Sequence, residues 1–315
     1  MTILVTGASG FLGSALCARC FRDGVSVRGA VRLSSQKSVC VETMRIGEIS
    51  LNTDWSDALL NVQHVVHLAA RAHVMNDKSS DPLTEFRCVN VEGTRRLARQ
   101  AAAKGVKRFI FVSSIKVNGE STEVDRPFTT DDIPAPEDPY GVSKHEAEQL
   151  LHQISAETGM EVVIIRPPLV YGPGVKANFE SMLRWLSRGL PLPLAAVTKN
   201  RRSLVALDNL VDLIVTCLNH PAAANQTILV SDGEDLSTAD LLRRMGEAMG
   251  RPARLFYVPT ALLKLGVTVV SKPGIYQRLC GSLQLDIAKT QQLLDWTPPM
   301  SVDEGLRRAT NEFRK

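Results

Sequence analysis

The sequence predicts an α/β protein built on a doubly wound parallel sheet, with a smaller, interleaved and mainly helical second domain. Three observations predict this fold class. Short apolar runs alternate with helix-length segments through the first half of the chain, a glycine-rich turn follows the first run, and prolines and glycines cluster at residues 166–174 and 189–193. Strands that are apolar throughout are buried on both faces, which is typical of a parallel sheet covered by helices.

The first half of the chain is expected to alternate between strands and helices. The strands are expected at residues 3–5, 25–31, 65–68, 109–112 and 162–165, and the helices at 12–22, 90–104 and 141–157. Prolines and glycines then interrupt the pattern. The chain is then expected to return to the first domain with a strand at 202–207, a helix at 209–219 and a strand at 227–230. The remainder is expected to be mainly helical. The predicted domains are residues 1–171 plus 204–231, and residues 172–203 plus 232–315.

Composition indicates a globular protein and excludes several classes of function. The 315 residues are 44% hydrophobic, which is enough for a substantial core. The 37 basic and 33 acidic residues leave a net charge of +4, too small to predict a nucleic-acid surface. The six histidines lack metal-binding spacing, and the C-x-x-C of Cys17 and Cys20 has no second pair at zinc spacing. We therefore predict no metal site and no nucleic-acid partner.

The sequence predicts neither a secretory signal nor an integral membrane segment. Residues 1–6 lead directly into a glycine turn, and no run reaches the ~18 apolar residues of a spanning helix. The nearest candidate, residues 255–270, is interrupted by Pro259, Lys264 and Gly266. That segment is expected to lie either against the core or against a membrane surface. We expect a cytoplasmic protein.

The glycine-rich turn T-G-A-S-G-F-L-G, residues 6–13, joins the first strand to the first helix. Gly7 permits a tight turn, Gly10 lets the backbone approach a pyrophosphate, and Gly13 lets the helix lie close to the sheet. The phosphates would meet free N–H groups at the positive end of that helix. We therefore predict a dinucleotide site in which Phe11 and Leu12 take part beside the three glycines.

The end of the second strand indicates which dinucleotide binds. An acidic residue there would accept hydrogen bonds from the adenosine ribose and favour NAD. This chain has Arg32, followed by Ser34, Ser35 and Lys37. Because cations and hydroxyls suit a 2′-phosphate, the sequence favours NADP(H). NAD(H) is the alternative if Arg32 is a solvated loop charge.

A tyrosine and a lysine four residues apart, Tyr140 and Lys144, share one face of the third predicted helix. A phenol has a reference pKa of about 10, so a neighbouring ammonium and a cationic nicotinamide are needed to favour its phenolate. Ser114, near the end of the preceding strand, offers a hydroxyl to a substrate oxygen. We expect Ser114, Tyr140 and Lys144 to be catalytic, with Lys144 also holding the cofactor ribose.

Together these motifs resemble the extended short-chain dehydrogenase/reductase family, and the resemblance covers nearly the whole chain. The family's T-G-x-x-G-F-x-G matches residues 6–13, its H-L-A-A matches 67–70, and its R-P-x-x-V-Y-G-P matches 166–173. Its serine and Y-x-x-x-K match the three catalytic candidates. The resemblance implies a Rossmann-type sheet with a nicotinamide cofactor.

The resemblance also implies further cofactor contacts. Leu68, Ala69 and Ala70 would line the cofactor. Pro167 would lie in the nicotinamide pocket, and Glu48 and Ile49 would contact the adenine. Two positions depart from the family. An aspartate is commoner than Glu48, and Asn118-Gly119 replaces the usual Tyr-Gly, which we interpret as tolerated packing.

The downstream segments resemble the nucleotide-sugar branch of that family. Asn178, Leu192 and Arg202 match positions at which such enzymes hold a uridine diphosphate. A guanidinium suits a diphosphate because its fork pairs with two phosphate oxygens. The resemblance therefore implies a UDP-sugar substrate, whose reacting sugar would also contact Ser114.

Within this branch the sequence favours reduction of a UDP-4-keto-6-deoxy-hexose(amine), with hydride transfer to C4 and Tyr140 as the acid. A 4,6-dehydratase needs an Asp-Glu pair directly after the serine, where this chain has Ile115 and Lys116, so dehydration is not expected. Arg32 favours NADPH consumption over tightly bound NAD. A more distant resemblance is to enzymes that make UDP-N-acetylquinovosamine for bacterial O-antigens. A UDP-glucose or UDP-N-acetylglucosamine 4-epimerase is the alternative.

A non-catalytic NADP(H) sensor is a third hypothesis, from another class. Sensors of this fold usually lose the tyrosine or the lysine, whereas this chain keeps the whole catalytic set. Relatives pair through helices that match residues 90–104 and 141–157. The resemblance therefore also implies a homodimer.

Overall fold

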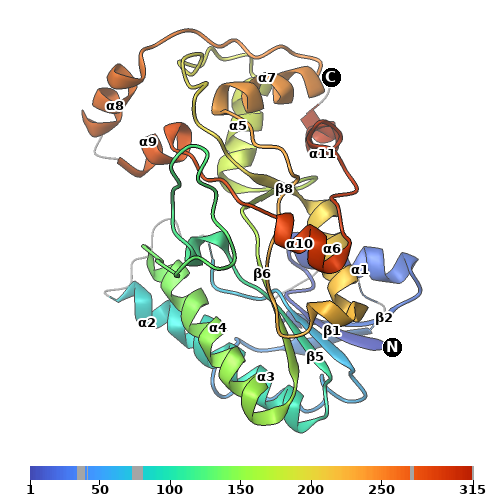
Figure 1. Ribbon diagram of the computed structural model, residues 1–315. Coiled ribbons are helices and arrows are strands. Elements are labelled where there is room, and N and C mark those ends of the chain that lie inside the picture. Colours follow the sequence, from blue (N-terminus) through green and yellow to red (C-terminus); the bar gives the residue numbers. More distant parts are fainter. Residues whose placement is uncertain (34–39, 41, 73–80, 270–272, 314–315) are drawn as a thin grey trace.

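Seven parallel strands form the central sheet, in the order β3-β2-β1-β4-β5-β6-β9 (Figure 1). They are β1 (Thr2–Thr6), β2 (Ser26–Arg32), β3 (Glu42–Ile46), β4 (His64–His67), β5 (Arg108–Val112), β6 (Glu161–Arg166) and β9 (Thr227–Leu229). The computed structural model describes residues 1–33, 40, 42–72, 81–269 and 273–313. The predicted Rossmann-type α/β fold is confirmed. The strand that sequence reasoning missed, β3, lies at the sheet edge and has no buried residue, so it lacks an apolar run.

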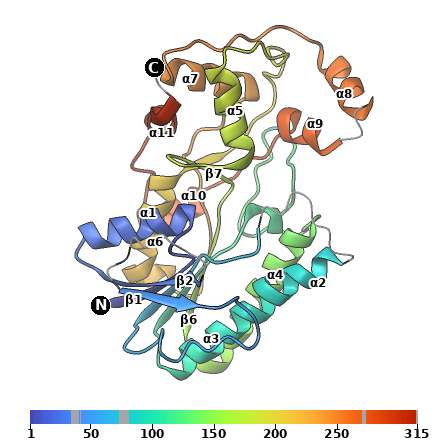
Figure 2. The ribbon, with the colours of Figure 1, turned by 180° about the vertical axis from the view of Figure 1, so that it is seen from behind.

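Helices cover both faces of this sheet (Figures 1 and 2). One face carries α1 (Phe11–Arg22) and α6 (Leu207–Asn219), and the other carries α3 (Thr94–Ala103) and α4 (Pro139–Thr158). The helix expected at 90–104 is a π-helical turn, Cys88–Gly93, that continues into α3 and follows the short α2 (Pro82–Arg87). The long α4 begins where Asp138 caps its first turn and ends at Gly159, which has a positive φ of 75°.

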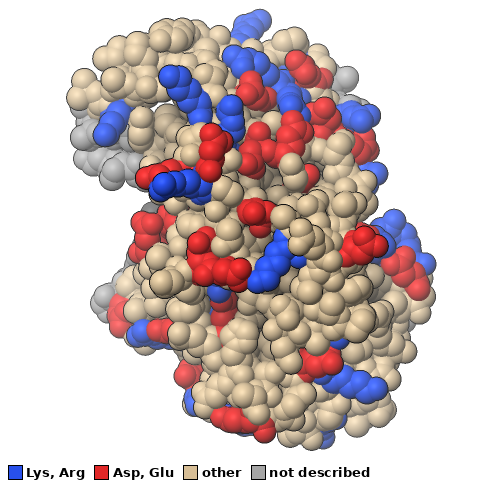
Figure 3. Space-filling model, viewed as in Figure 1, with Lys and Arg blue, Asp and Glu red and all other residues tan. Residues whose placement is uncertain are grey.

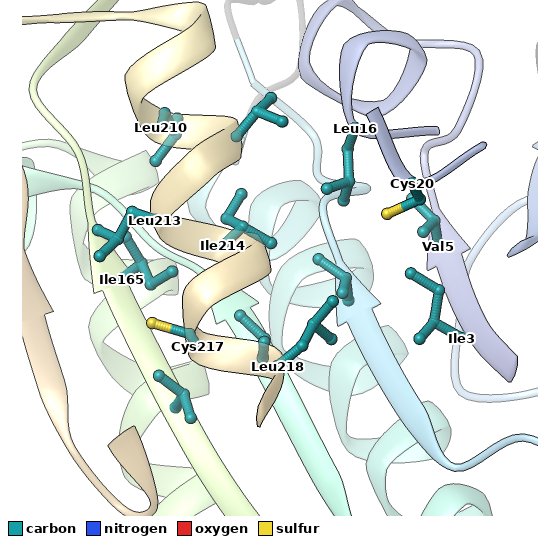
Figure 4. Packing of buried hydrophobic residues seen from close by; sticks show 14 of the residues in the cluster. Ile3, Val5, Leu16, Cys20, Ile165, Leu210, Leu213, Ile214, Cys217 and Leu218 are labelled. Atoms are coloured by element: carbon teal, nitrogen blue, oxygen red, sulfur yellow. The ribbon is translucent and has the colours of Figure 1, made fainter. Parts of the chain in front are cut away.

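The core follows the alternation of side chains along each strand. Ile3 and Val5 of β1 point to the α1 and α6 face, whereas Leu4 joins the cluster under α3 and α4. Figure 4 shows the first cluster, in which α1 and α6 supply Leu16, Cys20, Leu210, Leu213, Ile214, Cys217 and Leu218. Cys17 is also buried in this cluster, so both cysteines of the C-x-x-C are packed in the core.

A second group of elements lies beyond one end of the sheet (Figure 1). It holds β7 (Leu169–Tyr171), α5 (Ala177–Ser187), β8 (Leu204–Ala206), α7 (Thr238–Ala248), α8 (Thr260–Val269), α9 (Pro273–Cys280) and α11 (Val302–Ala309). The strand expected to return to the first domain, β8, instead pairs with β7 in a separate two-stranded sheet. The physical reason is Pro167-Pro168 after β6: proline has no N–H for the ladder, so the chain leaves the large sheet there.

The return to the large sheet is made by β9, which pairs with β6, and by α10 (Ala288–Leu294). Leu294 and Trp296 are buried in the cluster under α1 and α6. The division of the chain into two domains stays a prediction. The sequence placed residues 288–294 in the second domain, whereas α10 packs on the large sheet. Among the described residues, no helix is long and apolar enough to cross a membrane.

Candidate active site

The order of the strands reverses between β1 and β4, and their ends meet in register at Thr6 and His67. The Thr6 hydroxyl is 2.6 Å from Nδ1 of His67 and accepts the backbone N–H groups of Leu68 and Ala69, each at 3.2 Å. Burial, and then the charge of Lys144, lowers the pKa of His67 to about 3, so its imidazole is neutral. This pair fixes residues 68–70 at the crevice where doubly wound sheets bind their ligands.

The glycine turn forms a close-fitting cradle beside those residues. A Cβ atom on Gly7 would lie 3.0 Å from the backbone nitrogen of Ala69, and one on Gly13 would lie 2.1 Å from the Gly7 oxygen. Helix α1 starts after Gly10 with no side-chain cap and no acidic residue in its first turn. Its first N–H groups, beside the half-buried Phe11 and Leu12, are therefore available to a phosphate.

The residues expected at the adenosine end lie beyond the ends of β2 and β3. Arg32 is the last residue of β2 and is exposed, and Glu48 is also exposed. Ile49 is half-buried and packs against Gly93, where an added Cβ would come within 2.4 Å of its Cγ2. Ser34, Ser35 and Lys37 lie outside the described residues.

Lys144 is buried, with 2% of its surface exposed. Its Nζ donates to the Val112 carbonyl at 2.8 Å and lies 4.2 Å from the centre of the Phe111 ring. Burial lowers its pKa to about 7, although the Glu148 carboxylate opposes this effect. No other acceptor for the Lys144 amine is present among the described residues. Its unused N–H groups fit the ribose hydroxyls of a dinucleotide.

Tyr140, one turn earlier on α4, has its ring edge against Phe86 at a centroid distance of 6.0 Å. The part of the chain that the structure describes offers no hydrogen bond to its hydroxyl. Burial, and then the Asp138 carboxylate, raises the pKa of Tyr140. The predicted shift toward the phenolate depends on the Lys144 ammonium together with a bound cationic nicotinamide, so it stays a prediction. In the protein alone, desolvation of the phenolate dominates.

Ser114 follows β5 and caps a short 3₁₀ turn, where its Oγ accepts the N–H of Lys116 at 3.2 Å. The next residue, Ile115, donates its N–H to the Pro167 carbonyl at 3.0 Å. The turn after β6 therefore lies directly beside Ser114, the serine expected to be catalytic. This is where the family resemblance placed the nicotinamide pocket.

Lys116 connects the Ser114 segment to the start of the Tyr140 helix. Its Nζ lies 2.6 Å from Glu120 and 2.5 Å from Asp138, and the same Asp138 accepts the N–H of Gly141 at 2.6 Å. Burial lowers the pKa of Lys116, but its bonds to the two carboxylates outweigh this and raise it. An ammonium held in this way cannot serve as a base, and Ile115 is buried, so the geometry agrees with the expected absence of dehydration. The Asp138-Pro139 pair is typical of a helix start and signals the cap of α4, but no sequence pattern signals the ion pair with Lys116.

Asn118, which departs from the family pattern, has a structural role. It is buried, accepts from Arg166 at 2.9 Å and donates to the Thr129 carbonyl at 3.0 Å. Arg166 also forms a buried ion pair with Glu148 on α4. Asn118 thereby fixes the loop after Ser114 to β6 and α4, and the prediction of tolerated packing understates its role.

Of the three expected substrate contacts, Arg202 is the one whose surroundings fit an anion. Its guanidinium donates to the Gly281 carbonyl at 3.1 Å, burial lowers its pKa, and no carboxylate among the described residues pairs with it. Asn178 is exposed in the first turn of α5. Leu192 is buried and lines an apolar cavity of about 200 Å³.

Residues 281–286 connect Arg202 to the loop that follows Ser114. Thr122 and Phe128 of that loop donate their N–H groups to the carbonyls of Ser282 and Gln284, at 2.9 and 2.8 Å. On the other side, Ser203 donates to the Leu283 carbonyl at 2.8 Å. Residues 281–286 thus lie between the half-buried Arg202 guanidinium, which no described carboxylate pairs, and the segment that follows Ser114. No sequence pattern indicated this link, because it joins three distant segments.

Comparisons with known proteins agree with this geometry. A family model described as NAD dependent epimerase/dehydratase family matches residues 3–231. A UDP-glucose 4-epimerase of Vibrio cholerae is 50% identical over 313 residues, covering 99% of this chain and 95% of that protein. The structure of a UDP-glucuronic acid 4-epimerase from Bacillus cereus has a TM-score of 0.80 at 24% identity, covering 99% and 96% of the two chains. A UDP-N-acetylglucosamine 4-epimerase from the same species also has a TM-score of 0.80, at 21% identity and full coverage of both chains.

These relatives bear on the predictions in different ways. The two solved structures share the fold, and the Vibrio cholerae relative fits the 4-epimerase alternative better than the favoured 4-ketoreductase. The family description names NAD, and nothing in the comparisons supports a preference for NADP(H).

Proposed function

The chain belongs to the NAD-dependent epimerase/dehydratase family of nucleotide-sugar enzymes, and we propose that it is a 4-epimerase of a UDP-hexose or UDP-N-acetylhexosamine that works with NAD(H). One observation carries this proposal: the 50% identity to a UDP-glucose 4-epimerase extends over 99% of the chain. The intact set of Ser114, Tyr140 and Lys144 supports catalysis over a sensor role.

The described residues fit a dinucleotide. The N–H groups at the start of α1 would hold the pyrophosphate, and Lys144 would hold the nicotinamide ribose. Residues 68–70 and Pro167 would line the cofactor, with Glu48 and Ile49 near the adenine. When bound, the nicotinamide would supply a hydride acceptor and donor for the sugar C4.

The proton steps belong to Tyr140. Its phenolate takes the proton of the sugar 4-hydroxyl and later gives the same proton back to the C4 oxygen, so no proton is consumed. Ser114 donates a hydrogen bond that orients this oxygen. Because burial raises the pKa of Tyr140, the phenolate forms only when positive charge is placed next to it, which confines the chemistry to the assembled complex.

Arg202 would bind the diphosphate of the substrate. A half-buried guanidinium with a single carbonyl acceptor lacks a counter-charge, and a diphosphate would supply one through two parallel hydrogen bonds. Asn178 and Leu192 would contact the remaining nucleotide. The anion thereby fixes the sugar end of the substrate toward Ser114.

Reduction of a UDP-4-keto sugar with NADPH is the second candidate, and the observation that favours it is Arg32. This residue is exposed at the end of β2 and pairs with no described carboxylate, so a 2′-phosphate could reach it. In that reaction Tyr140 gives a proton to the C4 oxygen and does not regain it from the substrate. Cofactor turnover therefore separates the two candidates.

The experiment is to purify the protein, release any retained nucleotide with acid and identify it by mass spectrometry. UDP-glucose and UDP-N-acetylglucosamine are then incubated without added reductant, and the 4-epimers are quantified. Retained NAD and epimers without net NADH formation are expected. Rapid NADPH oxidation with a UDP-4-keto-6-deoxy sugar, and no epimers, would favour the reductase instead.

We also propose that two chains pair through α3 and α4. These helices lie together on the outer side of the large sheet, where a second copy could extend them into a four-helix bundle (Figure 2). Light scattering after gel filtration should give twice the chain mass of 34.4 kDa. The mass of a single chain at micromolar concentration would contradict this pairing.

A further inference from the structure

Two segments of the second domain carry cations and no carboxylate. Residues 181–207 and 248–285 contain ten basic residues and no acidic one: Arg184, Arg188, Lys199, Arg201, Arg202, Arg251, Arg254, Lys264, Lys272 and Arg278. The chain as a whole has 37 basic and 33 acidic residues. These two segments therefore hold a local positive excess that the net charge of +4 conceals.

The fold places these two segments side by side. Leu192 donates its N–H to the Arg254 carbonyl at 2.9 Å, and Phe256 donates to the Leu192 carbonyl at 3.0 Å. Trp185 of α5 and Leu263 of α8 line the same cavity as Leu192. The end of α5, the strand-like residues 254–256 and α8 thus form one continuous region.

Large apolar side chains are exposed on this region. They are Trp185 (50% exposed), Leu190 (42%), Phe256 (48%), Tyr257 (72%), Leu262 (57%) and Leu265 (61%), and together they define the α8 face. Leu255 and Leu263, in contrast, pack against the core of the second domain. The segment that was expected either against the core or against a membrane surface therefore has some side chains packed on the core and others exposed, with Val270 outside the described residues.

Cations lie among these apolar side chains. Arg254 and Phe256 are both exposed, two positions apart on an extended segment. Arg188 is exposed one turn after Trp185, and Lys264 is exposed between Leu262 and Leu265. Neither Arg188 nor Arg254 pairs with a carboxylate in the described part of the chain. Figure 3 shows the α8 end as tan surface with blue side chains, whereas red side chains gather toward α7 and α11.

We propose that the α8 face binds the surface of an anionic phospholipid bilayer. Tryptophan, tyrosine and leucine side chains enter the headgroup region of a bilayer, and arginine and lysine beside them attract anionic headgroups. A second copy of the chain fits less well. In a two-fold symmetric dimer each surface meets its own copy, so cations would face cations without a carboxylate between them.

The test is sedimentation of the full-length protein with vesicles. Wild type is mixed with vesicles of phosphatidylglycerol and phosphatidylcholine in equal parts, and separately with phosphatidylcholine alone, at low and at high salt. The double variant Leu262→Ser/Leu265→Ser removes exposed apolar side chains from the face. The matched control, Leu60→Ser/Ile133→Ser, removes two exposed apolar side chains elsewhere (55% and 88% exposed).

Wild type and the control pair are expected to sediment with the anionic vesicles at low salt and much less with phosphatidylcholine or at high salt. The α8-face variant is expected to bind about tenfold more weakly or worse. Unchanged activity on a soluble substrate and an unchanged thermal midpoint would show that this variant is folded. Sedimentation of wild type no greater than without vesicles, or equal binding by the α8-face variant, would overturn the proposal. A dimer in solution that the α8-face variant dissociates would also overturn it.

Discussion

Replacing Lys144 by methionine tests the electrostatics of the site independently of the reaction. The Lys144 amine is buried, has one carbonyl acceptor at 2.8 Å and lies over the Phe111 ring, with no paired carboxylate among the described residues. Methionine fills a similar volume without a charge. In the nucleotide-free protein we expect Lys144→Met to be more stable than wild type at neutral and acidic pH.

The magnitude follows from the lowering of the Lys144 pKa from 10.5 to about 7. Each pKa unit corresponds to about 1.4 kcal/mol, so the buried ammonium costs at most about 5 kcal/mol of folding free energy. Between these two pKa values the unfolded chain binds the proton and the folded chain does not, so the stability of wild type rises with pH. The cost is complete below pH 7 and disappears near pH 10.5. The advantage of the methionine variant should therefore be largest in acid and shrink through this window.

Urea unfolding of both proteins at about pH 6, 8 and 10 measures this difference, because contributions from all other groups cancel between them. Lys144→Arg is the companion variant. A guanidinium keeps its charge throughout the range, so this variant should lack the pH-dependent term yet stay less stable than Lys144→Met at every pH. If wild type and Lys144→Met differ by the same free energy at all three pH values, then Lys144 is not a buried ammonium with a lowered pKa.

Three further substitutions probe the site. Tyr140→Phe removes the acid and base and should lower kcat by ~10²- to 10⁴-fold while the retained nucleotide, quantified after acid release, stays at the wild-type level; near-normal turnover would refute the role of Tyr140. Gly13→Ala places a Cβ 2.1 Å from the Gly7 carbonyl oxygen, so it should lower the free energy of unfolding by about 1–3 kcal/mol and abolish nucleotide retention. A wild-type thermal midpoint with full nucleotide content would contradict the close fit of the glycine turn. Arg202→Gln should raise KM for the UDP-sugar by about tenfold or more with little change in kcat, and an unchanged KM would exclude Arg202 from the diphosphate site.

Local patterns were sufficient to predict the sheet and to indicate the proposed cofactor residues. Continuous apolar runs predict strands buried on both faces because each strand lies between two helical layers. The spacing of Gly7 and Gly13 is recognisable because a Cβ at either position would meet backbone at about 3 Å or less. Tyr140 and Lys144 share a face because helix geometry brings residues four apart together.

Contacts between distant segments could not be predicted in this way. The ion pair of Lys116 with Asp138, and the hydrogen bonds that bring residues 281–286 between Arg202 and the loop that follows Ser114, join parts of the chain whose paths are set by the whole core. The desolvation of Tyr140, which raises its pKa in the protein alone, could not be predicted either. Desolvation depends on every neighbour that excludes water, whereas the sequence shows only which charges are nearby along one helix.

By itself, the sequence determined the parallel sheet and the glycine-rich turn, and it indicated the proposed catalytic residues, since each depends on spacing within one or two consecutive elements. Only the tertiary structure decided that β8 pairs with β7, that Arg202 is half-buried with no described carboxylate beside it, and that leucines of α8 are exposed among cations. The apolar pattern of α8 is compatible with a core helix or with a surface helix. Which of these it becomes depends on how many of its faces other segments cover, and that number is a property of the assembled fold.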